Sequence, residues 1–119
     1  MRNETETEIS INFIKWLHLV HPNRLYYHTP NGERRSLATG AKLKKMGVLP
    51  GVPDYTLLAR SGCGKYFGLF LELKSHNGRL SDSQRNFKTK LPDHFKFGVA
   101  YSLEGAINIV NHYLRPTDG

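Results

Sequence analysis

Cysteine, long apolar runs and acidic side chains are all scarce in this chain of 119 residues. The only cysteine, Cys63, cannot form an internal disulfide, so we expect a reducing, cytoplasmic location. No apolar run approaches the roughly 20 residues of a membrane helix, and the polar start MRNETETE is unlike a signal peptide. Repeats and Pro/Gly/Ser-rich linkers are also lacking, which predicts a single domain over residues 1–119 and no membrane partner.

The scarcity of acids leaves the chain strongly basic. Lys and Arg number 17 against 10 Asp and Glu, for a formal net charge of +7 at pH 7. A basic surface attracts polyanions, because each phosphate contact releases condensed counterions. Nucleic acid is therefore the first partner to consider, with acidic proteins and acidic membrane surfaces as alternatives.

Hydrophobic periodicity and turn residues predict alternating helices and strands. Strands that alternate with helices, and helices at both ends of the chain, predict an α/β fold with a mixed central sheet flanked by helices. Ile9, Phe13, Leu17 and Val20 recur at helical spacing and are expected on one buried face. The expected order is helix 5–20, strand 25–28, basic helix 36–47, strand 55–59, turn 61–64, strand 66–74, helix 81–91, strand 97–101 and helix 103–114.

Charged residues interrupt the most apolar of these strands. Side chains alternate between the two faces of a strand, so Leu69, Leu71 and Leu73 share one face. Glu72 and Lys74 then share the opposite face. A charge in such an apolar strand needs a partner, a metal or water.

A second carboxylate is expected beside this pair. Asp54 follows the rigid segment Gly51-Val52-Pro53 and begins the preceding strand. Counting back from a hairpin turn centred between residues 62 and 63 places Asp54 opposite Leu71, next to Glu72, with a slip of one or two residues allowed. Two carboxylates and one lysine thus converge.

This convergence suits phosphodiester hydrolysis. Asp54 and Glu72 supply the oxygen ligands that Mg²⁺ prefers, and the carbonyl of Leu73 is a further candidate ligand. Lys74 can position or help deprotonate a metal-activated water, or stabilise the transition state. The alternative is a structural salt bridge at a sheet edge, within a basic module that binds nucleic acid without cutting it.

The pattern Pro53-Asp54 followed by Glu72-x-Lys74 resembles the PD-(D/E)xK nuclease superfamily, which has a restriction-endonuclease-like core. The surrounding segments PNGERR, KLKKMGVLPGVPDYTLL and FGLFLELKSHNGRLSDSQ look like its VRR-NUC branch, particularly the small stand-alone form common in phages. The resemblance runs over residues 6–114.

The resemblance implies roles for individual residues and a cofactor. Asp54 and Glu72 are implied as metal ligands, Lys74 as the catalytic lysine and Gln84 as an active-site residue, with dependence on Mg²⁺ or Mn²⁺. The family often has glutamate and glutamine four residues apart on the first helix, and here those positions are Glu6 and Ser10. Glu6 shares a helical face with Ile9 and is preferred to Glu8 as a third acidic ligand.

Two of these residues have a purely structural alternative. Ser81 and Gln84 form the S-x-x-Q pattern of a capping box, which stabilises a helix start without any catalysis. At the first helix, Asn3 or Thr5 can cap while Glu6 or Glu8 reaches back.

The densest basic cluster directly precedes Asp54 in the sequence. We interpret it as a phosphate-contacting surface with low sequence specificity, the alternative being a solvated face. Its members are Arg34, Arg35, Lys42, Lys44 and Lys45.

The sequence therefore predicts a metal-dependent DNA endonuclease. The resemblance implies branched DNA, such as Holliday junctions or flaps, as substrate, and a homodimer acting in a phage-infected cell. A two-fold dimer suits symmetric cutting of a junction. The competing hypotheses are a non-catalytic nucleic-acid-binding module and an exonuclease of the same fold.

Overall fold

The computed structural model describes residues 3–30 and 37–116. Helices and strands follow the predicted order, and the predicted α/β class with a mixed, helix-flanked sheet is confirmed. Among the described residues, no helix combines the length and apolarity needed to cross a bilayer. The elements are α1 (Glu6–Val20), β1 (Tyr26–His28), α2 (Leu37–Lys45), β2 (Tyr55–Leu57), β3 (Gly68–Leu73), α3 (Asp82–Lys90), β4 (Phe95–Ala100) and α4 (Leu103–Leu114).

The sheet has the order β1-β2-β3-β4 and is mixed. β1 pairs antiparallel with β2, and β2 pairs antiparallel with β3. A turn joins β2 to β3, whereas α2 lies in the connection between β1 and β2. β4 runs parallel to β3, so the chain must cross back, and α3 lies in that crossover. The N-terminal end of β2 and the C-terminal ends of β3 and β4 therefore lie at the same end of the sheet.

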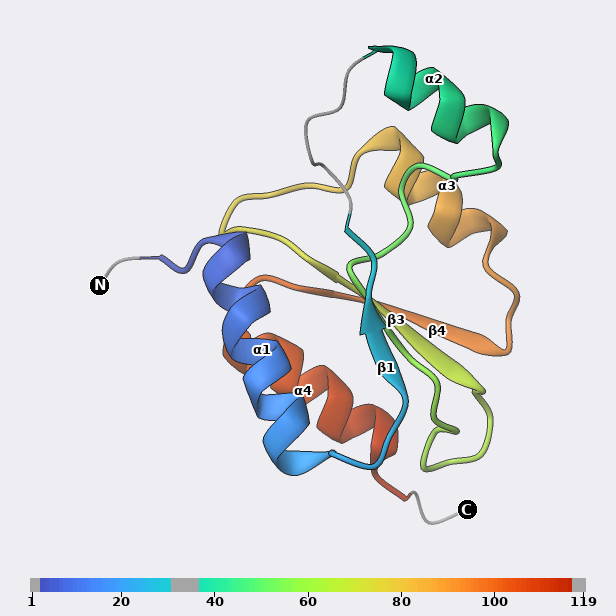
Figure 1. Cartoon of the computed structure of the whole chain (residues 1–119). Coiled ribbons are helices and arrows are strands. Elements are labelled where there is room, and N and C mark those ends of the chain that lie inside the picture. Colours follow the sequence, from blue (N-terminus) through green and yellow to red (C-terminus); the bar gives the residue numbers. More distant parts are fainter. Residues whose placement is uncertain (1–2, 31–36, 117–119) are drawn as a thin grey trace.

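α1 and α4 lie side by side on one face of the sheet (Figure 1). Their apolar residues pack on the strand side chains that point to this face, and this is the core predicted from the leucines at alternate positions. The buried members include Ile9, Phe13, Leu17, Leu69, Leu71, Leu73, Ala106, Val110 and Tyr113.

The predicted buried face of α1 was wrong at its last residue. Val20 is 48% exposed, whereas Ile9, Phe13 and Leu17 are buried. Val20 ends the helix, and His21 already leaves helical geometry with φ −128° and ψ 52°. The last turn therefore runs past the sheet that covers the earlier turns.

The opposite face of the sheet carries α3 over β3 and β4. Phe87 of α3 packs on Phe70 of β3, with ring centroids 5.4 Å apart, and Lys88 lies over the ring of Phe97. α2 lies beyond α3, at the end of the molecule away from α4 (Figure 1). The predicted cap of this basic helix, Ser36, lies outside the described residues, while Gly47 follows its end with φ +96°.

The hairpin register differs from the predicted count by one residue. Tyr55 pairs with Leu71 and Leu57 pairs with Leu69. Continued by one residue, this register places Asp54 opposite Glu72 rather than Leu71. The shift falls within the slip allowed from the sequence, and it brings the two carboxylates directly beside each other.

Candidate active site

A pocket of about 470 Å³ opens at the ends of β2 and β3 away from their hairpin turn. Every residue predicted to catalyse or to hold a metal borders it, although these residues come from four separate parts of the chain. The lining residues are Glu6, Thr7, Ser10, Ile11, His28, Asp54, Glu72, Leu73, Lys74 and Gln84. The side chain of Leu73 belongs to the core, so only its backbone is available to this pocket.

Asp54 is held in place by hydrogen bonds from two strands. Its Oδ2 accepts from the backbone N–H of Leu73 at 2.7 Å. Its carbonyl oxygen accepts from the backbone N–H of Thr29 and from Nδ1 of His28, each at 2.8 Å. The carboxylate is therefore fixed against the end of β3 before any ligand binds.

Glu72 is the most deeply buried charged residue of the pocket. It is 2% exposed, and its Oε2 accepts from Nε2 of Gln84 at 2.9 Å. Its Oε1 is buried with no hydrogen-bond partner among the described residues. A buried carboxylate oxygen without a partner is costly, so this atom suits coordination by a cation or a water.

The carboxyl of Glu72 has a strongly perturbed pKa. Burial, the negative charge of Asp54 and a hydrogen bond to Asp54 together raise the pKa from 4.5 to about 8, against the opposing positive charge of Lys74. The environment of Glu72 therefore favours the protonated carboxyl over the carboxylate. A bound divalent cation would supply the positive charge that two adjacent carboxylates need in order to ionise together.

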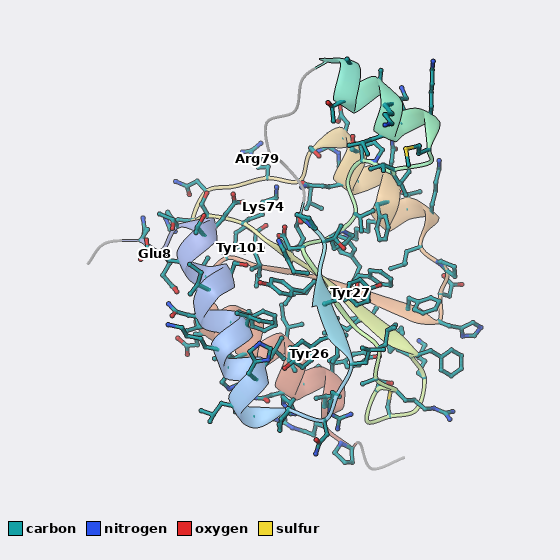
Figure 2. The ribbon with its side chains drawn as sticks, viewed as in Figure 1. Glu8, Tyr26, Tyr27, Lys74, Arg79 and Tyr101 are labelled. Carbon is teal, nitrogen blue, oxygen red and sulfur yellow. The ribbon has the colours of Figure 1, made fainter. Side chains whose placement is uncertain are left out.

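Lys74 continues β3 into the pocket rim. Its backbone N–H donates to the carbonyl of Ala100 at 2.9 Å, which extends the parallel pairing beyond the strand. The turn at Gly78 folds back against the side chain of Lys74, since a Cβ added to Gly78 would lie 3.1 Å from Cβ of Lys74. Figure 2 shows Lys74 near the first turn of α1, with Arg79 beyond it.

Gln84 caps its helix and also borders the pocket. Its side-chain Oε1 accepts from the backbone N–H of Ser81 at 2.8 Å, and its own N–H donates to Ser81 Oγ, so the capping box is confirmed. Its Nε2 is then directed at Glu72. The helix start therefore orients the amide that holds the buried carboxylate.

Gly51 fixes the loop before Asp54 against the start of α3. A Cβ on Gly51 would lie 2.3 Å from the carbonyl oxygen of Ser83 and 2.7 Å from the backbone nitrogen of Gln84. Its φ of +86° is also in the left-handed region that favours glycine. Only glycine permits this approach, which brings Asp54 and Gln84 to the same pocket.

The first helix contributes Glu6 to the pocket and Glu8 to its own cap. Thr5 Oγ1 accepts from the N–H of Glu8, and the Glu8 carboxylate accepts from the N–H of Thr5, which confirms the second capping box. Glu6 borders the pocket, whereas Glu8 does not and lies on the side of α1 away from Lys74 (Figure 2). Ser10, one turn after Glu6, is hydrogen-bonded to the hydroxyl of Tyr55 at 2.5 Å.

The basic cluster is only partly described. Lys42, Lys44 and Lys45 are exposed on α2 and do not line the pocket. Arg34 and Arg35 lie outside the described residues. The predicted contact between this cluster and phosphate stays a prediction.

Sequence reasoning missed His28 as a pocket residue. It borders the pocket and donates to the carbonyl of Asp54, so Nδ1 carries the proton in this contact. It is the last residue of β1 and pairs with Tyr55. The available signal was its place at the end of a predicted strand, and it was too weak because the sequence did not predict which strand this one pairs with.

The donor set fits a hard divalent cation. Asp54 and Glu72 offer carboxylate oxygens, one of them buried and unpartnered, and Glu6 borders the same pocket. Within residues 3–30 and 37–116, no group of three or more His, Cys, Asp or Glu side chains is close enough to hold an ion unaided. Mg²⁺ fits such a site, because it usually keeps several waters and few protein ligands.

Comparison with known proteins shows what this chain is similar to. The sequence profile of the VRR-NUC domain matches residues 4–104, which include all pocket residues. A solved structure described as "VRR_NUC domain protein" has a similar fold, with TM-score 0.74 and 24% identity over 99% of this chain and 96% of that chain. No curated protein matches the chain in sequence.

Proposed function

The chain belongs to the VRR-NUC family of nuclease domains, and on that premise we propose that it is a metal-dependent endonuclease that cuts branched DNA. The observation that carries the proposal is the buried Glu72 carboxylate, with its Oε1 unpartnered among the described residues, beside the half-buried Asp54. A protein that only binds DNA gains nothing from such a pair, since carboxylates repel phosphate unless a cation intervenes.

Asp54 and Glu72 would hold Mg²⁺ or Mn²⁺ together with the carbonyl of Leu73, and Glu6 of α1 would interact with the ion through one of its waters. A bound divalent cation lowers the pKa of its water and neutralises negative charge on the phosphate. Asp54 arrives already fixed by the N–H of Leu73, and Glu72 by the amide of Gln84. The chain therefore presents preorganised oxygens, which reduces the cost of binding the ion.

Lys74 has the position and charge to act on the reacting groups. Its ammonium borders the same pocket as both carboxylates. There it would orient the attacking water and stabilise the charge that develops on the phosphate oxygens as the leaving oxygen departs. Gln84 acts through Glu72 and is a positioning residue.

The basic balance of the chain supports DNA as the substrate. The net charge of +7 and the exposed lysines of α2 suit phosphate contacts. A junction or flap offers two or more arms to such a surface, and a homodimer would supply a second pocket for paired cuts.

The test is a cleavage assay on labelled four-way-junction, flap and plain duplex DNA, with Mg²⁺, Mn²⁺ or EDTA. We expect metal-dependent cleavage that favours a branched substrate, is lost in Lys74→Ala and is retained in Lys96→Ala. Lys96 is a matched control, because it is an exposed lysine on β4 outside the pocket. Tight binding without cleavage under either metal would instead leave a non-catalytic binding module.

A further inference from the structure

The outer edge of β4 is open. β4 is the last strand in the sheet order, and among the described residues it pairs with β3 alone. The carbonyl of Ala100 faces β3, where it accepts from the N–H of Lys74. Backbone groups alternate in direction along a strand, so the N–H and C=O groups of Phe97 and Val99 face the open side. Such groups can pair with an incoming extended chain.

An apolar pocket of about 360 Å³ lies beside this edge, on the sheet face that α4 covers and away from Glu72. Its lining includes Tyr66, Leu69, Lys96, Gly98, Ile109 and Arg115. Gly98 has no side chain, and a Cβ added there would lie 3.2 Å from Cγ2 of Ile109. Side chains of a strand added to β4 would alternate between the two sheet faces, so every second one would point toward this pocket.

The wall of the pocket at the hairpin turn is fixed before any ligand binds. The N–H of Gly62 donates to the carbonyl of Tyr113 at 2.9 Å, and the hydroxyl of Tyr113 donates to the carbonyl of Ala59 at 2.7 Å. A Cβ on Gly62 would collide with the carbonyl oxygen of Arg115, so only glycine permits this approach. The turn and the end of α4 therefore form a preorganised wall, which lowers the cost of binding.

The rim of the pocket is positively charged. The Nζ atoms of Lys65 and Lys96 lie 5.3 Å and 5.5 Å from the centroid of the Tyr66 ring, which borders the pocket. None of the described residues that line the pocket is aspartate or glutamate, and Asp93 and Glu104, which flank β4 in the sequence, do not border it. An occupant should therefore carry negative charge around an apolar side chain.

A peptide fits these features better than DNA or a second copy of this chain does. Pairing with β4 requires amide N–H and C=O groups at strand spacing, and a DNA backbone carries none. A second copy would bring a net charge of +7 and its own Lys96 to the same edge. Lysines on edge strands disfavour pairing between like chains, whereas they attract an acidic one.

We propose that the open edge of β4 binds an acidic peptide of a partner protein as an added strand, with one apolar side chain in the pocket beside α4. Phe97 and Val99 provide the backbone hydrogen bonds, and Lys65 and Lys96 provide the preference for acidic residues. The surface is separate from the acidic pocket that contains Glu72, so the proposal does not depend on the nuclease function.

The test is fluorescence anisotropy with a labelled peptide of about six residues, a usual strand length, in which glutamates and threonines flank a central phenylalanine. The control is the same peptide with N-methyl groups at alternate residues, which keeps the charge and side chains but cannot donate to β4. We expect the unmodified peptide to bind at least about tenfold more tightly, because backbone hydrogen bonds are lost in the control.

Protein variants test the edge and the charge separately. Val99→Pro removes an N–H that faces away from β3 and should abolish binding, whereas Val99→Thr keeps this N–H and should bind like wild type. Lys96→Glu should weaken binding about fivefold or more. Lys42→Glu makes the same charge change on α2 and should leave binding within about twofold. If Val99→Pro does not fold by thermal unfolding, the N-methylated peptide carries the test of strand pairing.

Three results would overturn the proposal. The first is equal binding of the two peptides, or binding that Lys96→Glu does not change. The second is a wild-type dimer that Val99→Pro converts to a monomer in sedimentation, since the edge would then be a subunit interface. The third is a loss of duplex DNA binding in Lys96→Glu as large as the loss of peptide binding, which would assign the surface to DNA.

Discussion

Two helices of this protein begin with the same capping box, and only one of the boxes reaches the candidate active site. At α1, Thr5 and Glu8 satisfy each other's backbone N–H groups, and Glu8 lies outside the pocket. At α3, Ser81 and Gln84 do the same, but Gln84 has an amide with a second hydrogen-bonding atom. That Nε2 donates to the buried Glu72.

The comparison shows why a motif does not determine a role. Both boxes arise from the same local need, because the first N–H groups of a helix lack partners within it. A carboxylate such as Glu8 can only accept, so it cannot support another carboxylate. The amide of Gln84 can cap with its oxygen and donate with its nitrogen, and α3 begins beside the end of β3.

The largest expected effect is on metal binding, when Glu72, the carboxylate that accepts from Gln84, is replaced. Glu72→Gln should weaken Mn²⁺ binding by more than the roughly 10- to 100-fold that follows loss of an outer-shell partner, since a ligand itself is removed. Isothermal titration calorimetry without DNA measures this directly. Glu8→Gln is the matched control and should bind Mn²⁺ like wild type; equal losses in both variants would contradict the assignment of Glu72.

Truncating Gln84 in one capping box and Glu8 in the other should separate the roles of these two residues. Gln84→Ala leaves Glu72 without its donor, and we expect cleavage to fall by roughly 10- to 100-fold. Glu8→Ala removes the equivalent cap residue from α1 and should leave cleavage within about twofold. The measurement is single-turnover cleavage of the preferred DNA, with thermal unfolding to confirm that both variants fold. A similar loss in both variants would mean that Gln84 acts only through helix stability.

The raised pKa of Glu72, which accepts a hydrogen bond from Gln84, predicts that the stability of the protein depends on pH. Because the folded-state pKa of Glu72 is raised to about 8, the folded protein binds a proton more readily than the unfolded chain between about pH 4.5 and 8. The contribution of Glu72 to stability is therefore present at low pH and is lost as pH rises through 8. Thermal unfolding of metal-free protein should show this decline, and Glu72→Gln should flatten it. An unchanged slope in the variant would assign the effect elsewhere.

The smallest expected effect is a loss of stability when the capping hydroxyl is removed, and it should be the same for both capping boxes. Thr5→Ala and Ser81→Ala each remove the hydroxyl that accepts from an orphan N–H, and each should cost about 1 kcal/mol of unfolding free energy. Urea unfolding measures both. In Ser81→Ala, Gln84 can still donate to Glu72, so cleavage should fall less than in Gln84→Ala. If Ser81→Ala is as inactive as Gln84→Ala, the cap itself positions the amide.

Much of the fold follows from local sequence patterns. The predicted bounds of the closing helix agree with α4, and those of the first helix agree with α1 to within one residue. Alternation in β3 correctly separates the buried leucines from the face with Glu72. Strand ends were less accurate, since β3 begins at Gly68 rather than residue 66 and β4 begins at Phe95 rather than residue 97.

The candidate site was predicted as a set of residues but not as a geometry. Spacing and family resemblance selected Asp54, Glu72, Lys74 and Gln84, and the pocket does bring them together. Neither could predict that Glu72 Oε1 is left unpartnered or that His28 donates to the carbonyl of Asp54. Their roles in catalysis and metal binding stay predictions.

The sequence by itself determined which residues face the same way on each helix and strand, because periodicity and capping depend on neighbours a few positions away. The tertiary structure decided which of these faces meet. The one-residue shift of the hairpin set Asp54 beside Glu72, and the close approach of Gly51 to Ser83 brought Gln84 to the same pocket. These contacts depend on strand register and on helix packing against the sheet, where one residue or a few tenths of an ångström changes the partner.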